Sequence, residues 1–112
     1  MEAEPASIAE ALEWLRKAFH REAADSLRLT YQLELSGEGG GGLWLRVDTG
    51  RLEMGEGPAA GPDVVLRLDA RDFFGILCGR ENPDLLFMAE RLQIDGDLSL
   101  ALKLRTLFSA TR

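Results

Sequence analysis

Apolar side chains near the start of the chain recur at intervals of three and four residues, the spacing of an amphipathic helix. Ser7 and Glu10 stand at the beginning of this run in the S-x-x-E order of a capping box, in which the two side chains satisfy backbone N–H groups of the first turn. The pattern therefore predicts a helix that begins after Ser7 and buries one face. Its apolar positions are Ile8, Ala11, Leu12, Leu15, Ala18, Phe19 and Ala23.

From Leu27 onward the apolar period changes to two, which is the period of a half-buried strand. Four segments alternate in this way, and Leu92 and Ile94 mark a short fifth strand. Thr49 and Gly50 connect two of the segments by a turn short enough for a hairpin. The four alternating segments are 27–36, 43–48, 51–56 and 64–68.

Trp44 interrupts an otherwise leucine-rich strand. It alternates with Leu43, Leu45 and Val47, so its side chain points to the opposite face of the sheet from theirs. If helices cover the leucine face, Trp44 lies on the outer face. We expect it to anchor a small cluster there, under the first helix.

Capping residues predict three shorter helices in the second half of the chain. Asp69 is a candidate N-cap, and Gly79 ends the same helix. The dipeptide Asn82-Pro83 begins another, since proline is preorganised for the first helical position. Asp97 caps a final helix that runs to Phe108.

The predicted strands and helices are segregated along the chain, which favours an α+β fold over the doubly wound α/β class. We expect a single, mainly antiparallel sheet with helices packed on one face. A chain of 112 residues has the size of one domain. We therefore expect residues 1–112 to form a single unit.

Charge and composition exclude several classes of function. The formal net charge is -6, and Lys and Arg are scattered in ones and twos, so no basic stripe is available to bind nucleic acid. The longest apolar run, Leu85–Ala89, is far too short to span a membrane. The N-terminal sequence MEAEPAS lacks the basic and apolar regions of a secretory signal. These features predict a soluble, cytoplasmic protein that binds no nucleic acid.

Few residues are candidates for catalysis or metal binding. Cys78 and His20 are the only cysteine and histidine, which excludes an internal disulfide, a thiolate zinc cluster and most histidine-based metal sites. No G-x-S-x-G elbow occurs. Asp69 and Asp72 are better explained as capping and first-turn charges than as an acid–base pair. We expect a protein that is not an enzyme and needs no metal or cofactor.

The last third of the chain carries more apolar side chains than one buried helix face requires. Leu85, Leu86, Phe87 and Met88 are consecutive, so at about 100° per residue they point all round a helix. The final helix likewise leaves only a narrow polar stripe. Such helices pack tightly into a core, close an apolar cavity or dock on a partner, and the pattern leaves all three readings open.

An ordered set of residues and short motifs along most of the chain matches the sequence pattern of one known protein family. In this order they resemble the sterol carrier protein type 2 domain, and the first helix and the first strand extend the resemblance over nearly the whole chain. Two positions depart from it: Glu90 stands where the family commonly has glycine, and Arg105 where glutamine is frequent. The residues that carry the resemblance are Trp44, Thr49-Gly50, Asp72-Phe73-Phe74, Gly79, Asn82-Pro83, Phe87, Leu92, Ile94, Gly96 and the "ALKL" segment at 101–104.

The resemblance implies a five-stranded sheet covered by helices, with a hydrophobic tunnel between them that takes fatty acids, acyl-CoA, sterols or phospholipids. We therefore predict a lipid carrier with one apolar cavity of roughly 300–1,000 Å³ for a fatty acyl, sterol-like or isoprenoid ligand. The residues predicted to line or cover it are Phe73, Phe74, Leu77, Leu85, Leu86, Phe87, Met88, Leu98, Leu102 and Phe108.

Arg105 is the candidate cation at the opening of this cavity. Its guanidinium suits the carboxylate or phosphate of an amphiphilic ligand, because it pairs with either anion through two charged hydrogen bonds. The alternative is a solvated arginine that complements the C-terminal end of the helix dipole.

A second hypothesis assigns the same apolar helices to protein contacts. The chain would then be a non-catalytic accessory module for an enzyme of lipid or ubiquinone metabolism, since domains of the resembled family occur in ubiquinone synthesis and fused to larger enzymes. The expected partners are a lipid or other apolar small molecule, with transient membrane or enzyme contacts. We expect a monomer or a weak homodimer.

Overall fold

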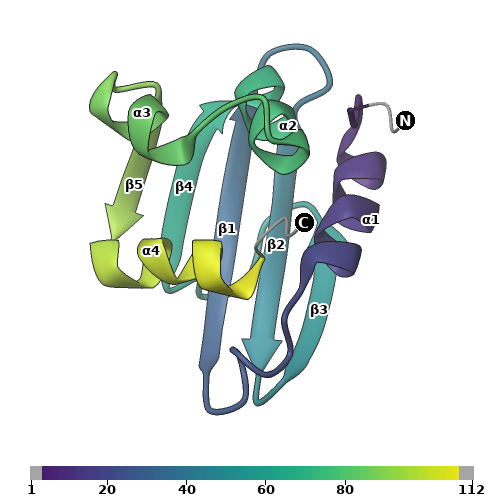
Figure 1. Cartoon of the computed structure of the whole chain (residues 1–112), viewed down its shortest axis with the longest axis vertical. Helices are drawn as coiled ribbons and strands as arrows, with labels where there is room; N and C mark the ends of the chain where they lie inside the picture. Colours follow the sequence, from purple (N-terminus) through teal and green to yellow (C-terminus); the bar gives the residue numbers. More distant parts are fainter. Residues whose placement is uncertain (1–3, 109–112) are drawn as a thin grey trace.

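The computed structural model describes residues 4–108, so the first three residues of the N-terminal MEAEPAS sequence lie outside the described part. Five strands and four helices follow one another within it (Figure 1). Their bounds in chain order are α1 Ile8–Ala18, β1 Arg28–Ser36, β2 Gly41–Asp48, β3 Arg51–Glu56, β4 Val64–Asp69, α2 Ala70–Cys78, α3 Pro83–Met88, β5 Leu92–Gly96 and α4 Leu98–Leu107.

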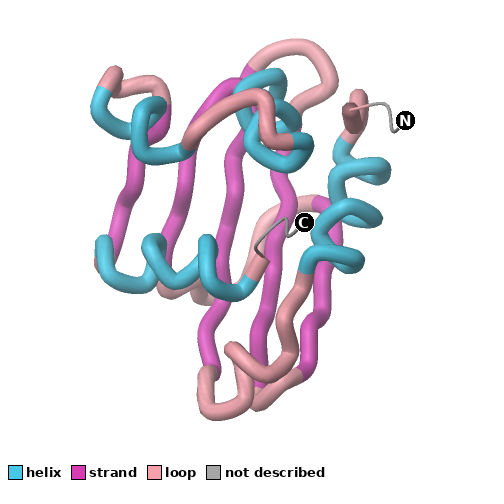
Figure 2. The backbone as a smooth tube through the Cα atoms, in the orientation of Figure 1, coloured by secondary structure: helices cyan, strands magenta, loops and turns pink. Residues whose placement is uncertain are grey.

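The strands form one sheet in the order β3-β2-β1-β4-β5. Neighbouring strands are antiparallel except for β1 and β4, which run parallel with Leu33 opposite Leu66. All four helices cover the same face of this sheet (Figure 2). The α+β class and the mainly antiparallel sheet predicted from the sequence are therefore confirmed.

The parallel pair exists because the chain crosses from the β3 edge to the far side of β1 before β4 begins. The connecting segment 57–63 passes over the outer face of the sheet. Asp63 accepts a hydrogen bond from the backbone N–H of Thr30 at 2.7 Å, and the side-chain oxygen of Gln32 accepts one from the backbone of Ala59. Thr30 and Gln32 are consequently buried although they face away from the helices.

The inner face of the sheet supplies most of the core. The apolar side chains that alternate along the strands pack there against the apolar faces of α1 and α2. The buried residues of the sheet's inner face are Leu29, Tyr31, Leu33, Leu35, Leu43, Leu45, Val47, Val64, Leu66, Leu68 and Leu92.

Trp44 lies on the outer face, as its alternation predicts. It stands opposite Gly55 on β3, and a Cβ at that glycine would lie only 2.7 Å from the indole. Gly55 therefore leaves the room that the ring occupies. The expected position under the first helix is wrong, because α1 covers the opposite face with Leu15.

Helix α1 ends at Ala18, earlier than its apolar pattern predicts. Beyond that point the ring of Phe19 packs against Phe108, with ring centroids 5.5 Å apart, and the backbone N–H of His20 donates to the carbonyl of Leu107 at 2.8 Å. The chain leaves the helix because these partners at the end of α4 replace the helical ones.

The capping residues act as predicted. Ser7 accepts a hydrogen bond from the backbone of Glu10 at 3.2 Å, while the Glu10 carboxylate accepts one from the backbone N–H of Ala6, one residue before the N–H that a capping box predicts. At the N-termini of the other three helices, the side chain of the N-cap residue accepts a hydrogen bond from the backbone two residues on. These N-caps are Asp69, Asn82 and Asp97.

The turn after α3 contains a strained residue. Glu90 has φ 63°, a left-handed conformation that costs a side-chain-bearing residue about 1–2 kcal/mol. We expect Glu90→Gly to raise the free energy of unfolding by about 0.5–1 kcal/mol, because glycine removes this strain and loses part of the gain through its freer unfolded chain. Denaturant unfolding measures the change.

Gly79 provides the matched control, since it follows α2 with φ 87° and a Cβ there would meet nothing within 4 Å. Gly79→Ala should therefore lower stability by about 1 kcal/mol through the backbone alone. A loss of stability in Glu90→Gly would contradict the strain at Glu90.

Candidate functional site

A cavity of about 850 Å³ lies between the sheet and the helical layer. In Figure 1, α4 crosses the lower half of the sheet, α2 and α3 lie over its upper end, and α1 runs beside β3. The cavity fills the space that these helices surround. Its floor consists of inward-facing side chains of the four strands β2, β1, β4 and β5, namely Leu45, Leu33, Leu66, Leu68, Leu92 and Ile94.

Helix α4 forms one wall of the cavity and is tied to the structure at both ends. Near its start, the hydroxyl of Tyr31 rises from β1 and donates to the carbonyl of Leu100 at 2.7 Å. At its end, Leu107 accepts the hydrogen bond from the backbone of His20. Burial, with a smaller contribution from Asp63, raises the pKa of Tyr31. The hydroxyl therefore stays protonated and keeps its role as donor.

Most of the residues predicted from the sequence to line a cavity surround this one. They come from α2, α3 and α4 and from the residue that follows α4. The predicted residues that line it are Phe73, Leu77, Phe87, Leu98, Leu102, Arg105 and Phe108.

The other four predicted residues do not line the cavity. Phe74 and Leu86 are buried in the core. Leu85 and Met88 are 62% and 76% exposed and lie outside the cavity lining. Helix α3 has only six residues, so its consecutive apolar side chains divide among core, cavity and solvent.

The contribution of α1 to the cavity lining was not predicted from the sequence. Trp14, Leu15 and Ala18 line the cavity from this helix. The signal was present, because Leu15 and Ala18 belong to the predicted apolar stripe and Trp14, four residues before Ala18, lies beside it. Trp14 therefore lies at the cavity, whereas Trp44 lies on the far side of the sheet.

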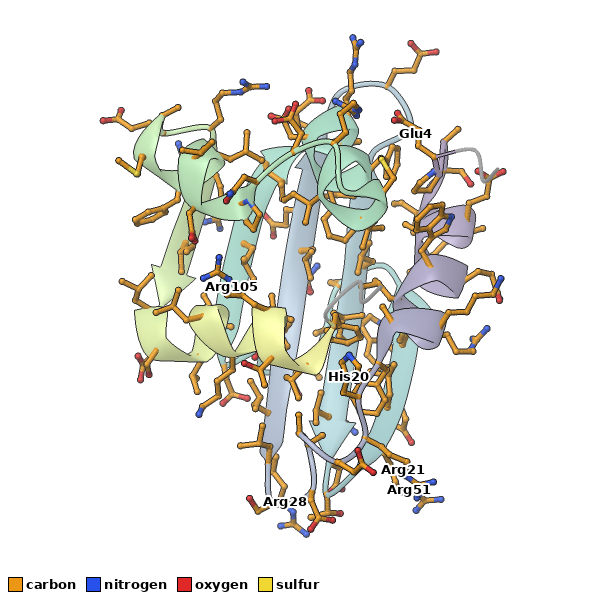
Figure 3. All side chains as sticks on the ribbon, viewed as in Figure 1. Glu4, His20, Arg21, Arg28, Arg51 and Arg105 are labelled. Carbon is orange, nitrogen blue, oxygen red and sulfur yellow. The ribbon has the colours of Figure 1, made fainter. Side chains whose placement is uncertain are left out.

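Charged side chains stand among the apolar ones at the edge of the cavity. Lining residues include the cations Lys17, Arg80 and Arg105 and the carboxylates Glu81 and Asp84. Arg105 Nη2 lies 2.7 Å from Asp84 Oδ2, so this ion pair connects α4 with α3. In Figure 3 the side chain of Arg105 points from α4 toward the upper helices.

Arg80 is more fully engaged than Arg105. Its guanidinium contacts Glu4 at 3.0 Å and Glu81 at 3.2 Å and donates to the backbone carbonyl of Arg71. The hydrogen bond with Arg80 lowers the pKa of Glu4 and raises the pKa of Arg80. These contacts tie the segment before α1 to the end of α2.

The candidate catalytic groups have structural partners. Asp72 is buried and pairs with Arg91 at 2.6 Å, and the Cys78 sulfur lies 3.6 Å from both Glu4 and the carbonyl of Gly75. Within residues 4–108, no three His, Cys, Asp or Glu side chains are grouped to hold a metal ion. No helix in the same range is long and apolar enough to cross a membrane.

A large apolar cavity between a sheet and its helical layer defines a domain that holds a small apolar molecule. Comparison with known proteins identifies the family. The sequence profile of the SCP-2 sterol transfer family matches residues 9–109. The chain belongs to this family, which confirms the resemblance found in the sequence.

Among the curated relatives, this domain occurs within longer chains. Hydroxysteroid dehydrogenase-like protein 2 of Xenopus laevis is 35% identical over 98 residues, which cover 87% of this chain and 24% of that protein. The chain thus spans about a quarter of the length of this curated relative.

Solved structures of other proteins share the fold. Palmitated SCP2L2 of Aedes aegypti superposes with a TM-score of 0.70 at 21% identity, over 95% of this chain and 97% of that one. The inverting sec-alkylsulfatase of a Pseudomonas species superposes with a TM-score of 0.78 at 14% identity, over 92% of this chain and 16% of that one.

The two tryptophans report on opposite faces of the sheet. In the single-tryptophan variant Trp44→Phe, which retains Trp14, we expect added fatty acid to change the fluorescence, because the indole lies at the cavity. In Trp14→Phe, which retains Trp44, the emission should stay unchanged. A response from Trp44 alone would contradict the location of the binding site.

Proposed function

We propose that this chain is a lipid carrier that holds one fatty acyl, sterol-like or isoprenoid ligand in the cavity between sheet and helices. The observation that carries this proposal is the cavity itself, whose volume of about 850 Å³ lies in the range of ligand pockets, roughly 300–1,000 Å³. Leucine, isoleucine and phenylalanine side chains form its floor and walls. Transfer of an acyl chain there from water contributes about 0.8 kcal/mol per CH₂.

The comparisons support the same ligand class. The family is described as a sterol transfer family, and the Aedes aegypti protein was solved in a palmitated form. The lipid's apolar part would occupy the space above Leu33, Leu45 and Leu66, and its head group would lie at the charged edge. We assign the head-group contact to Arg105, whose methylene stem covers apolar surface while its guanidinium reaches the opening.

The domain itself is proposed to be non-catalytic. Four of the charged side chains at the cavity form ion pairs, such as Arg105 with Asp84, and no nucleophile with an adjacent base lines the cavity within residues 4–108. The chemistry of longer relatives would then belong to their other parts.

The accessory-module hypothesis remains as a second candidate. One observation that supports it is the exposure of Leu85 and Met88, which give α3 an apolar surface outside the cavity. The other is the occurrence of the fold within the longer chains named above. Both functions can coexist, because these two side chains are separate from the cavity lining.

Lipid that copurifies with the protein tests the carrier function directly. Native mass spectrometry of the expressed protein should show one bound lipid per chain. In Ala18→Trp, a large ring replaces a small cavity-lining side chain, so we expect most of the lipid to be lost while the protein stays folded.

Ala9→Trp is the matched control, because Ala9 is exposed on the same helix and lies outside the cavity. It should keep the bound lipid. Retention of lipid by both variants, or its absence from the unaltered protein after exposure to fatty acid, would exclude this cavity as the carrier site.

A further inference from the structure

The ion pair between Arg105 and Asp84 lies where a ligand head group would approach. Both residues line the cavity, and each side chain is 52% exposed. The contact joins α4 to α3 across the cavity edge. An incoming anion therefore meets Arg105 already paired with a carboxylate of the protein.

Within the described residues, a single hydrogen bond holds the Arg105–Asp84 pair together. Among residues 4–108, the single bond from Arg105 Nη2 to Asp84 Oδ2 is the guanidinium's one hydrogen bond, whereas Arg80 has two carboxylate partners and a carbonyl. Because a guanidinium carries five N–H donors, Arg105 keeps donors that an anionic ligand can use. Arg105 is thus the more exchangeable of the two arginines.

We propose that Asp84 determines head-group specificity by competing with anionic lipids for Arg105. This inference rests on the proposed carrier function. A ligand carboxylate that reaches Arg105 either displaces Asp84 or lies beside it, where the like charges repel. An uncharged lipid leaves the ion pair intact. Asp84 therefore lowers the affinity for fatty acids relative to neutral lipids of the same chain length.

The size of the effect follows from the exposure of the pair. Exposed ion pairs contribute about 0.2–1 kcal/mol, which corresponds to a factor of about 1.5–5 in affinity. Replacing Asp84 by asparagine removes the charge and keeps the shape. Its backbone N–H, which donates to the Asn82 cap of α3, is unchanged by this substitution.

The experiment measures binding of palmitic acid and of its methyl ester to the delipidated full chain, at mildly alkaline pH where the acid is ionised. In Asp84→Asn we expect palmitate to bind about 1.5–5 times more tightly, with the ester unchanged. In Arg105→Gln, palmitate should bind more weakly and the ester as before. In the double variant, Asp84→Asn should bring no further gain, because its effect acts through Arg105.

Glu81→Gln is the matched control, since it removes a carboxylate from the same cavity edge and leaves the Arg105 pair intact. Its gain in palmitate affinity should be smaller than that of Asp84→Asn. Equal gains, or a gain that persists in the Arg105→Gln background, would show that the overall charge of the edge acts and would overturn the proposal.

Failure of the carrier function itself gives a different result. If neither palmitate nor the ester binds the unaltered chain, the proposed cavity function is wrong. If both bind and Asp84→Asn changes neither or both equally, the carrier function stands and the role of Asp84 is wrong. Thermal unfolding of each variant confirms that the comparison is between folded proteins.

Discussion

The hydroxyl of Tyr31 holds α4 above the sheet, and the cavity depends on this contact. Tyr31 is fully buried in the middle strand β1 and reaches the carbonyl of Leu100 with its hydroxyl, so the ring acts as a spacer between strand and helix. The Leu107 carbonyl fixes the other end of α4 through the backbone of His20. With both ends held, Leu98, Leu102 and Leu104 of α4 form one wall of the cavity above the sheet.

Local signals made most of the fold predictable from the sequence. Each cap depends on residues within one turn, so Ser7 and Asp69 could be recognised without tertiary information. The early end of α1 could not, because it results from Phe19 meeting Phe108, far along the chain. The parallel pairing of β1 with β4 likewise depends on how segment 57–63 is held over Gln32.

The sequence predicted that an apolar cavity exists, but it predicted only part of the set of residues that line it. Apolar periodicity counts side chains that avoid water, but it does not say which neighbour covers them. In α3, Leu86 enters the core, Phe87 meets the cavity and Met88 faces solvent, although their sequence pattern treats them alike. Trp14 is the opposite case. It lies at the margin of the apolar stripe of α1, yet it lines the cavity because the neighbouring helices leave that space open beside it.

The apolar walls and the charged edge of the cavity recognise different parts of a ligand. One methylene in a hydrophobic pocket changes binding by only about 1–3 kcal/mol, so the floor of leucines selects chain length weakly, and finer selection falls to the edge. The chain carries a net charge of -6, yet the cavity lining has the cations Lys17, Arg80 and Arg105 against two carboxylates. At physiological ionic strength charges are screened beyond about 8 Å. A head group at the opening therefore responds to this local excess of cations and to their partners, and not to the acidity of the whole protein.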